Sequence, residues 1–197
     1  MILARIFSLF FCHFYAISIF HFFIKRRFNS PISLQSTIFY NNIFMTKIKN
    51  KTILVTGGAG GMGKLLALRC LQKGAKQVIL WDINEEQLNK TTAELEQRTY
   101  KVHPYVVDVC QIKDIQWAAK DILNNIGKVD IIFNNAGIVV GKSFAEHSDE
   151  DMKRTIDINV LGVMRTTKAF IGAMLADGSG HIVNIASAAG LIPNPNM

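Results

Sequence analysis

Short apolar runs alternate with amphipathic stretches from residue 51 onward. The apolar runs are rich in β-branched residues and predict strands over 52–56, 77–81, 101–107, 129–135 and 181–186. Helical periodicity between these runs predicts helices over 64–73, 85–97, 113–126 and 150–175. Strict alternation of strand and helix favours right-handed crossovers and a parallel sheet covered on both faces. The expected fold class is therefore α/β, a doubly wound parallel sheet.

The N-terminal part of the chain has a different pattern. Residues 6–24 carry no formal charge, and as a helix they would be about 28 Å long, just enough to cross a bilayer. Arg5 precedes the run and three basic residues, 25–27, follow it, so the positive-inside rule places the rest of the chain in the cytosol. We therefore predict a membrane anchor over 1–27, a linker over 28–50 and a nucleotide-binding domain over 51–197.

Two other interpretations of the N-terminal part stay open. A cleaved signal peptide fits less well, because the basic cluster is on the wrong side of the run and no small-x-small cleavage site follows. If translation instead starts at Met45, the anchor does not exist and the protein is cytoplasmic. The glycosylation sequons at Asn50 and Asn89 test the topology, since only a lumenal domain could be modified there.

Net charge and cysteine content narrow the function classes. Residues 1–44 hold four of the 22 basic residues and none of the 15 acidic ones, which leaves a net charge of +3 on the rest of the chain. That surface is ordinary for a soluble domain and does not indicate a nucleic-acid partner. The three cysteines lack metal-ligand spacing, so we expect reduced thiols and no metal site.

A glycine-rich turn joins the first predicted strand of the domain to the first long helix. In "TGGAGGMG" Thr56 is followed by Gly57, Gly61 and Gly63 at Gly-x-x-x-Gly-x-Gly spacing, with Met62 between the last two. Such a backbone can turn tightly and approach a pyrophosphate, whose charge then rests on the helix N-terminus. Glycines also mark ordinary turns, so the string alone is weak evidence.

An acidic residue follows at the end of the second predicted strand, 19 residues beyond Gly63. The carboxylate of Asp82 can accept hydrogen bonds from the adenosine ribose hydroxyls and would repel a 2′-phosphate. No Lys or Arg lies within the glycine turn to attract that phosphate. The two observations favour NAD over NADP as cofactor. The alternative role for Asp82 is a helix N-cap, because "DINEE" also resembles a helix start.

Further polar residues follow the third and fourth predicted strands of the domain. Asp108 and Val109 end one of them, and the motif Asn134-Asn135-Ala136-Gly137 ends the other. The carboxyl edge of an open α/β sheet is where ligands bind, so these residues are candidates for the cofactor site. Asp108 could instead cap the next turn.

These motifs, with Asn159 in "INVLG" and Ser187 in "NIASAAG", occur in the order and spacing of the short-chain dehydrogenase/reductase family, which residues 50–197 resemble. The segments "VILWDIN" and "GHIVNIASAAG" look most like the membrane-associated retinol and hydroxysteroid dehydrogenases. The resemblance implies a Rossmann-type domain that transfers a hydride between NAD and a lipophilic alcohol or ketone. It also implies attachment to the endoplasmic reticulum or lipid droplets, and possible homo-oligomers.

The resemblance assigns catalytic roles to two residues. Ser187 would hydrogen-bond the substrate oxygen, and Asn159 would hold a helix bend and a water in the proton relay. The family's Tyr-x-x-x-Lys motif should follow Ser187, but the sequence ends ten residues later. We therefore expect a sequence cut inside the active site. The alternatives are a non-catalytic dinucleotide-binding protein and a non-functional gene product.

Overall fold

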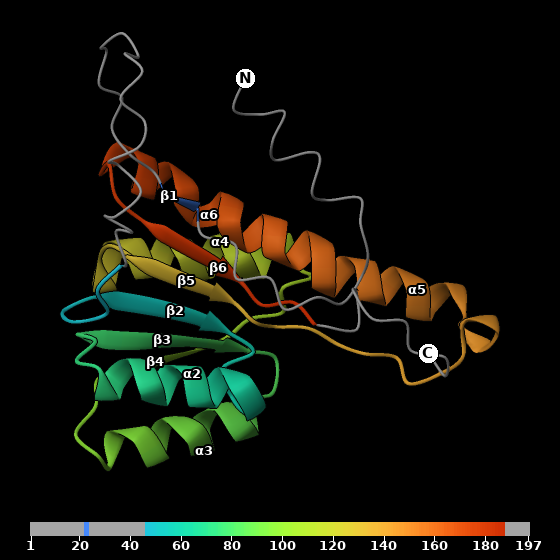
Figure 1. Cartoon of the computed structure of the whole chain (residues 1–197), viewed down its shortest axis with the longest axis horizontal. Coiled ribbons are helices and arrows are strands. Elements are labelled where there is room, and N and C mark those ends of the chain that lie inside the picture. The colour runs from blue at the N-terminus through green and yellow to red at the C-terminus, as the bar shows by residue number, and fades with distance from the viewer. Residues whose placement is uncertain (1–21, 24–45, 188–197) are drawn as a thin grey trace, which may run out of the picture.

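Six strands form one sheet in the computed structural model, which describes residues 22–23 and 46–187 (Figure 1). The spatial order is β1-β6-β5-β2-β3-β4. The five strands from β2 to β6 are mutually parallel, and β1 runs antiparallel to β6 at one edge. The strands are β1 Phe22–Phe23, β2 Thr52–Thr56, β3 Gln77–Asp82, β4 Val102–Val106, β5 Ile131–Asn134 and β6 His181–Asn184.

Helices cover both faces of this sheet (Figure 1). The α-helices are α2 Gly61–Gln72, α3 Glu85–Glu96, α4 Ile112–Asp121, α5 Asp149–Ile156 and α6 Val163–Ala176. α2 and α3 pack on one face, and α4 and α6 pack on the other. The predicted doubly wound α/β fold is therefore confirmed.

Two of the predicted helices continue through π-helical turns. The helix predicted over 113–126 is α4 followed by η2 (Ile122–Ile126), and that predicted over 150–175 is α5, η4 (Asp157–Gly162) and α6 in succession. A short 3₁₀ turn, η3 (Phe144–Glu146), precedes α5. π-turns inside helices are rare and occur frequently at functional sites.

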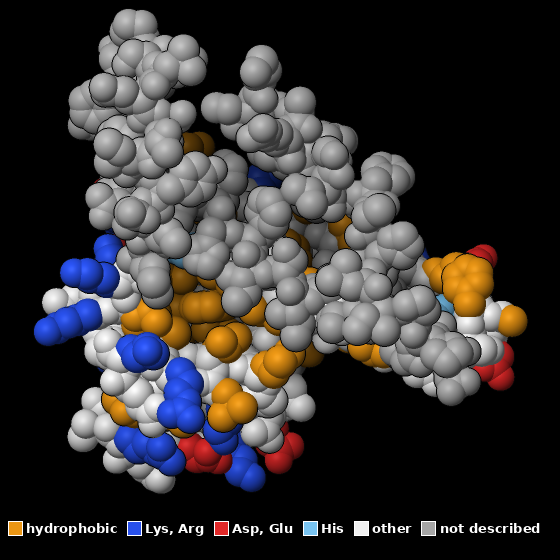
Figure 2. Space-filling model, viewed as in Figure 1, with side chains coloured by type: hydrophobic (Ala, Val, Ile, Leu, Met, Phe, Trp, Pro, Cys, Tyr) orange, Lys and Arg blue, Asp and Glu red, His pale blue; other side chains and the backbone are white. Residues whose placement is uncertain are grey.

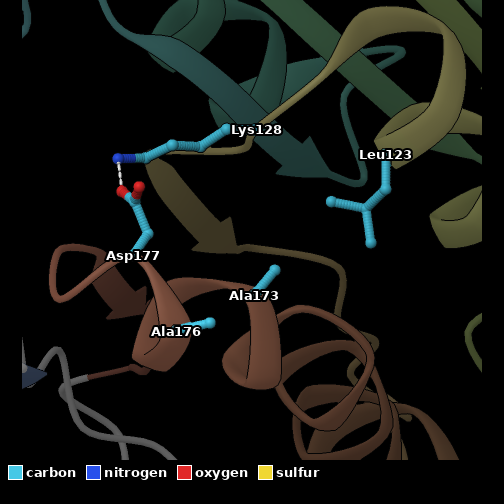
Figure 3. A pocket seen from close by; sticks show the side chains of 5 residues that line it. All are labelled: Leu123, Lys128, Ala173, Ala176 and Asp177. Carbon is cyan, nitrogen blue, oxygen red and sulfur yellow. Dashed lines mark hydrogen bonds and ion pairs between the residues drawn. The ribbon is translucent and has the colours of Figure 1, made fainter.

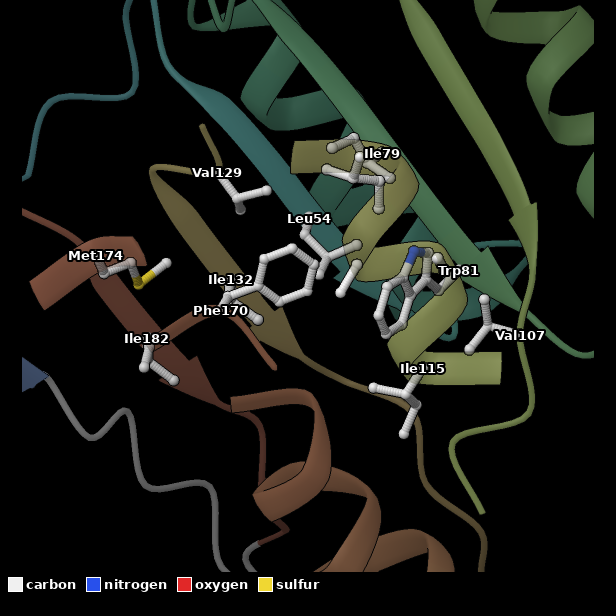
Figure 4. Close-up of a cluster of buried hydrophobic side chains, with 13 residues drawn as sticks. Leu54, Ile79, Trp81, Val107, Ile115, Val129, Ile132, Phe170, Met174 and Ile182 are labelled. Carbon is white, nitrogen blue, oxygen red and sulfur yellow. The ribbon is translucent and has the colours of Figure 1, made fainter. Parts of the chain in front are cut away.

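The alternation of side chains along the strands divides the core between the two faces. On the α4 and α6 face, Leu54, Ile79 and Ile132 pack with Trp81 and Phe170 (Figure 4). The Trp81 and Phe170 rings are tilted, with centroids 5.7 Å apart. The neighbouring strand residues turn to the α2 and α3 face and include Ile53, Val55, Val78, Leu80 and Ile131. All three central strands are thus apolar on both faces, as parallel sheets require.

β4 forms the opposite edge of the sheet and differs from the central strands. From His103 onward its residues alternate between half-buried and exposed, and it contains Pro104, which has no N–H to donate to a neighbouring strand. Proline is tolerated in a sheet where a strand has only one partner.

Charged side chains join the elements at the amino edge of the sheet. Asp130 accepts hydrogen bonds from the Lys51 ammonium at 2.8 Å and from the Thr52 N–H at 3.0 Å, and Lys128 lies 3.4 Å away. Burial raises the pKa of the Asp130 carboxyl, but the hydrogen bonds from Lys51 and Thr52 and the charge of Lys128 outweigh burial and bring it below 3.8.

Basic side chains dominate the part of the surface that carries α2 (Figure 2). No Asp or Glu occurs in the first 81 residues, so β2, α2 and the adjoining turns contribute only basic charge. Asp82 is the first acidic residue of the chain. Within α2 the basic residues are Lys64, which pairs with Glu94, and Arg69 in the last turn.

The predicted anchor lies outside the described residues except for Phe22 and Phe23, which form β1. The division of the chain at residues 27 and 50 stays a prediction. Among the described residues, no helix combines the length and the apolar character that crossing a bilayer requires.

Replacing Phe170, which is 1% exposed, tests the core packing. Phe170→Ala should lower the free energy of unfolding by about 3–5 kcal/mol, because it removes apolar contacts and leaves a cavity against Trp81. Leu175→Ala on the same helix is the control, since Leu175 is 55% exposed, and should change stability by less than about 0.5 kcal/mol. Urea unfolding measures both values, and equal losses would contradict this packing.

The ion cluster predicts a pH-dependent contribution from Asp130. Because its pKa is lower in the folded state, ionised Asp130 stabilises the fold at neutral pH, and this stability is lost as the pH falls through the folded pKa. Asp130→Asn should therefore be less stable than the wild type at pH 7, with a gap that narrows as the pH falls from about 5 toward the folded pKa. Urea unfolding across that range measures the gap. The exposed Glu96→Gln is the control and should show no such convergence.

Candidate functional site

The residues predicted for the site gather at the carboxyl ends of the parallel strands. Thr56, Asp82 and Asn134 are the last residues of β2, β3 and β5. The segments containing Asp108 and Ser187 follow β4 and β6. The structure therefore brings motifs from five separate parts of the sequence to one edge of the sheet, which is the edge where open α/β sheets bind ligands.

The glycine turn between β2 and α2 depends on the missing side chains of Gly57 and Gly63. Gly57 has φ +64°, a left-handed conformation that strongly favours glycine. A Cβ on Gly63 would lie 2.0 Å from the Gly57 carbonyl oxygen, so the first turn of α2 packs directly on the loop backbone. Gly61 also has a positive φ, +49°, but the space around its Cβ position is open.

The start of α2 is suited to an anion. Gly60 is the N-cap residue and provides no capping side chain, and the first turn contains no acidic residue. The first N–H groups of a helix have no partner within the helix, and the helix dipole places positive charge there. Met62, 61% exposed, lies in this turn. A phosphate or pyrophosphate group is a suitable ligand for such a helix end.

Thr56 and Asn135 join the glycine turn to the end of β5. The Thr56 hydroxyl accepts hydrogen bonds from the N–H groups of Asn135 and Ala136, both at 3.0 Å. In return the Asn135 side-chain amide donates to the carbonyls of Thr56 at 3.0 Å and Gly57 at 3.2 Å. The sequence identifies Asn135 only as a member of the Asn-Asn-Ala-Gly motif, and the motif alone does not predict its position against Gly57 and Gly63.

Asp82 is hydrogen-bonded to both neighbouring loops. Its Oδ2 accepts from the Ala59 N–H at 3.0 Å and its Oδ1 from the Asn84 N–H at 3.0 Å. The N-cap of α3 is Asn84, whose side chain accepts from the Gln87 N–H. Asp82 therefore is not the N-cap residue of α3. A carboxylate oxygen has more than one lone pair, so each oxygen of Asp82 can still accept a hydrogen bond from a ligand hydroxyl.

Asp108 and Val109 make local contacts beside this edge. Asp108 Oδ1 accepts from the Cys110 N–H at 2.8 Å, which supports the turn after β4. Burial and the neighbouring Asp108 carboxylate raise the pKa of the Cys110 thiol. Val109 is buried, and a Cβ on Gly162 would lie 2.9 Å from its Cγ2. Position 162 therefore has room only for glycine.

Asn134 lies beneath the edge rather than in the open part of the site. It is 2% exposed, and its amide donates to Asn184 Oδ1 at 2.8 Å and to Thr167 Oγ1 at 3.1 Å. These bonds join β5, β6 and α6. Asn134 therefore stabilises the sheet edge through these buried hydrogen bonds.

Asn159 braces the segment that follows Gly137. It lies in η4, where its Oδ1 accepts from the Ile138 N–H at 2.9 Å and its Nδ2 donates to the Ile138 carbonyl at 2.9 Å. A Cβ on Gly137 would lie 3.3 Å from Asn159 Oδ1. The π-turn provides the helix irregularity expected at this residue. The amide oxygen can accept a second hydrogen bond and the NH2 group can donate a second one, so the relay water stays a prediction.

Ser187 follows β6 at the same edge and is partly buried.

Tyr105 occupies a different environment, on β4, where its hydroxyl donates to Asp121 at 2.6 Å and its ring packs edge-on against Trp117. Burial and the Asp121 carboxylate raise the pKa of Tyr105 well above its ordinary value. Tyr105 is therefore not suited to act as an acid or base beside Ser187.

A surface hollow lies away from this edge. A hollow of about 420 Å³ is lined by Leu123, Ala173, Ala176 and the ion pair of Lys128 with Asp177 (Figure 3). None of the predicted site residues lines it. Within residues 22–23 and 46–187, no three His, Cys, Asp or Glu residues lie close enough to hold a metal ion.

Comparisons with known proteins agree with this geometry. Residues 51–197 match the model of the short chain dehydrogenase family. Estradiol 17-beta-dehydrogenase 11 of Pongo abelii is 39% identical over 148 residues, which are 75% of this chain and 49% of that protein. Epidermal retinol dehydrogenase 2 of Homo sapiens is 39% identical over 146 residues, 73% of this chain and 47% of that protein.

Solved structures of similar fold include proteins with bound NAD. An NAD⁺-bound xylitol dehydrogenase superposes with a TM-score of 0.72 and 33% identity, over 77% of this chain and 58% of that one. A short-chain dehydrogenase/reductase from Burkholderia phymatum in complex with NAD gives 0.73 and 32%, over 78% and 54%. This chain spans about half the length of the curated relatives it matches.

The close approach of α2 to the glycine turn can be tested by adding one methyl group. Gly63→Ala should lower the free energy of unfolding by more than about 2 kcal/mol, because the new Cβ would collide with backbone that cannot move freely. Gly60→Ala is the matched control: no atom lies within 4 Å of its Cβ position, and φ is −154°. Urea unfolding measures both, and a Gly63→Ala variant as stable as Gly60→Ala would contradict the contact.

Proposed function

This chain belongs to the short-chain dehydrogenase family, and we propose that it binds NAD at the carboxyl edge of its sheet as part of an oxidoreductase acting on a lipophilic alcohol or carbonyl. The observation that carries the proposal is the hydrogen bond between Asp82 and Ala59. It holds a carboxylate beside the glycine turn, where the adenosine end of a dinucleotide would meet both.

Three features of the site support a dinucleotide. The uncapped start of α2 suits the pyrophosphate, and Gly57 and Gly63 remove the side chains that would block its approach. Asp82 suits the two adenosine ribose hydroxyls and opposes a 2′-phosphate by charge repulsion. The turn itself contains no Lys or Arg to attract that phosphate. These features favour NAD over NADP.

The bound nicotinamide would supply the chemistry by accepting a hydride from the alcohol carbon or returning it to the carbonyl carbon. In this proposal the Ser187 hydroxyl hydrogen-bonds the substrate oxygen and orients it. Asn159 keeps the segment after Gly137 in place through its two bonds to Ile138. A hydride cannot leave the alcohol carbon unless the hydroxyl proton is also removed, so a general base is needed beside Ser187. Resemblance assigns that role to a Tyr-x-x-x-Lys motif, which residues 1–197 do not contain.

The substrate class follows from the relatives. One is named for estradiol and another for retinol, and both molecules are apolar alcohols. We propose the same chemical class for this protein. The apolar run 6–24 suits this class, because a membrane anchor would keep the enzyme where such substrates dissolve.

Location and assembly are part of the same proposal. We place the protein on the endoplasmic reticulum membrane or lipid droplets with its folded domain in the cytosol, or in the cytoplasm if translation begins at Met45. We also propose a homo-oligomer that uses the helices of residues 150–175.

A binding protein without catalysis is the competing function. It would use the same glycine turn and Asp82 but lack the base beside Ser187. Saturable NADH binding without turnover of any alcohol by the full-length protein would favour it.

Cofactor preference tests the proposed site directly. The wild-type protein should bind NADH at least about tenfold more tightly than NADPH, because Asp82 repels the additional phosphate. Asp82→Asn keeps the shape and removes the charge, so it should reduce that preference by about tenfold or more. The control is Glu85→Gln, which removes a nearby charge from the first turn of α3. Fluorescence titration of the three proteins with each nucleotide measures the affinities, and an unchanged NADH preference in Asp82→Asn would refute the assigned role.

A further inference from the structure

The Ala59 peptide groups are held from two sides. Its N–H donates to Asp82 Oδ2 at 3.0 Å. Its carbonyl accepts from the Thr91 hydroxyl at 2.5 Å and from the Gln87 side-chain amide at 3.3 Å. Thr91 and Gln87 lie on α3, 32 and 28 residues further along the chain. A helix outside the recognised motif therefore fixes the glycine turn.

Of the two bonds to the Ala59 carbonyl, the one from Thr91 is the stronger because it is buried. Thr91 is 0% exposed, so no solvent competes for its hydroxyl. The Gln87 amide also approaches the Thr91 hydroxyl at 3.4 Å, which makes the two side chains part of one network. A hydrogen bond sheltered from water costs more to break than an exposed one, because the carbonyl left behind finds no replacement donor.

Because the peptide group is planar, the bond from Thr91 to the Ala59 carbonyl also fixes the direction of the next N–H. In a trans peptide the C=O and the N–H of the next residue point in opposite directions. The carbonyl of Ala59 points toward α3, so the N–H of Gly60 points away from α3. The Gly60 position is open, with no atom within 4 Å of a Cβ built there. Gly60 is only partly buried, and its N–H points away from α3.

We propose that Thr91, assisted by Gln87, is a positioning residue of the nucleotide site. It holds the Ala59 carbonyl, and this fixes the direction of the Gly60 N–H, while the bond from the Ala59 N–H to Asp82 holds the preceding peptide group. The inference rests on the proposed function, because the group it positions is the candidate dinucleotide site. Thr91 itself touches neither cofactor nor substrate.

The adjacent threonine provides a matched control. Thr92 is 7% exposed, and its hydroxyl donates to the Leu88 carbonyl within α3 at 2.9 Å. Thr→Val at either position replaces a buried, hydrogen-bonded hydroxyl with a methyl group of similar size. Only the change at Thr91 removes a contact with the glycine turn.

Two measurements on the full-length protein test the proposal. In Thr91→Val the Kd for NADH should rise about tenfold, and hydrogen exchange of the 57–63 segment without nucleotide should become about tenfold faster. Thr92→Val should stay within about twofold of the wild type in both. Thr91→Ser keeps the hydroxyl and should restore both values to within about twofold.

The outcomes separate this inference from the proposed function. Equal effects of Thr91→Val and Thr92→Val would overturn the positioning role and leave only a general loss of stability. Unchanged exchange in Thr91→Val would also overturn it. If the wild type does not bind NADH, the proposed function fails, and the exchange data still decide whether Thr91 holds the turn.

Discussion

The contact between the first turn of α2 and the carbonyl of Gly57 is the constraint on which the candidate site depends. A Cβ at position 63 would lie 2.0 Å from that oxygen, well inside the distance at which atoms repel. Because helix and loop meet backbone to backbone, the N–H groups at the helix start come as close to the sheet edge as the chain permits. The bonds from Asn135 then hold the loop in this position. An anion bound there meets peptide groups that need little reorganisation.

The ion pairs of the sheet and the candidate site lie at opposite ends of the strands. At the amino edge, Lys51, Lys128 and Asp130 close the sheet with ion pairs. At the carboxyl edge, polar groups support one another in pairs and leave the Gly60 and Gly61 positions open. The apolar core of Leu54, Ile132 and their neighbours lies between the two ends, so the sheet can keep its packing while the carboxyl edge stays open.

Local pattern was sufficient to predict strands β2 to β6, the doubly wound sheet and the positions of Thr56, Asp82 and Asn134 at strand ends, but it did not predict β1, which lies within the run expected to form a helical anchor. These features depend on short-range periodicity and on where apolar runs stop. The roles of particular side chains were harder to predict, since they depend on contacts between distant segments. Asn84, rather than Asp82, caps α3. Asn159 uses both its polar groups on Ile138, and Thr91 reaches Ala59 across 32 residues. Spacing along the sequence does not encode such pairings.

The π-turn η4 is a local helix irregularity that contacts segments at the carboxyl edge of the sheet. A regular helix through residues 157–162 would place side chains at intervals of 3.6 residues, whereas the wider turn changes that phase and directs Asn159 toward Ile138. The same stretch ends at Gly162, which allows Val109 to pack against the helix. Two segments that leave the sheet edge, after β4 and after β5, are thus fixed by one helical irregularity. The rigidity of the edge therefore comes from α3 on one face and η4 on the other, and the glycine turn lies between them.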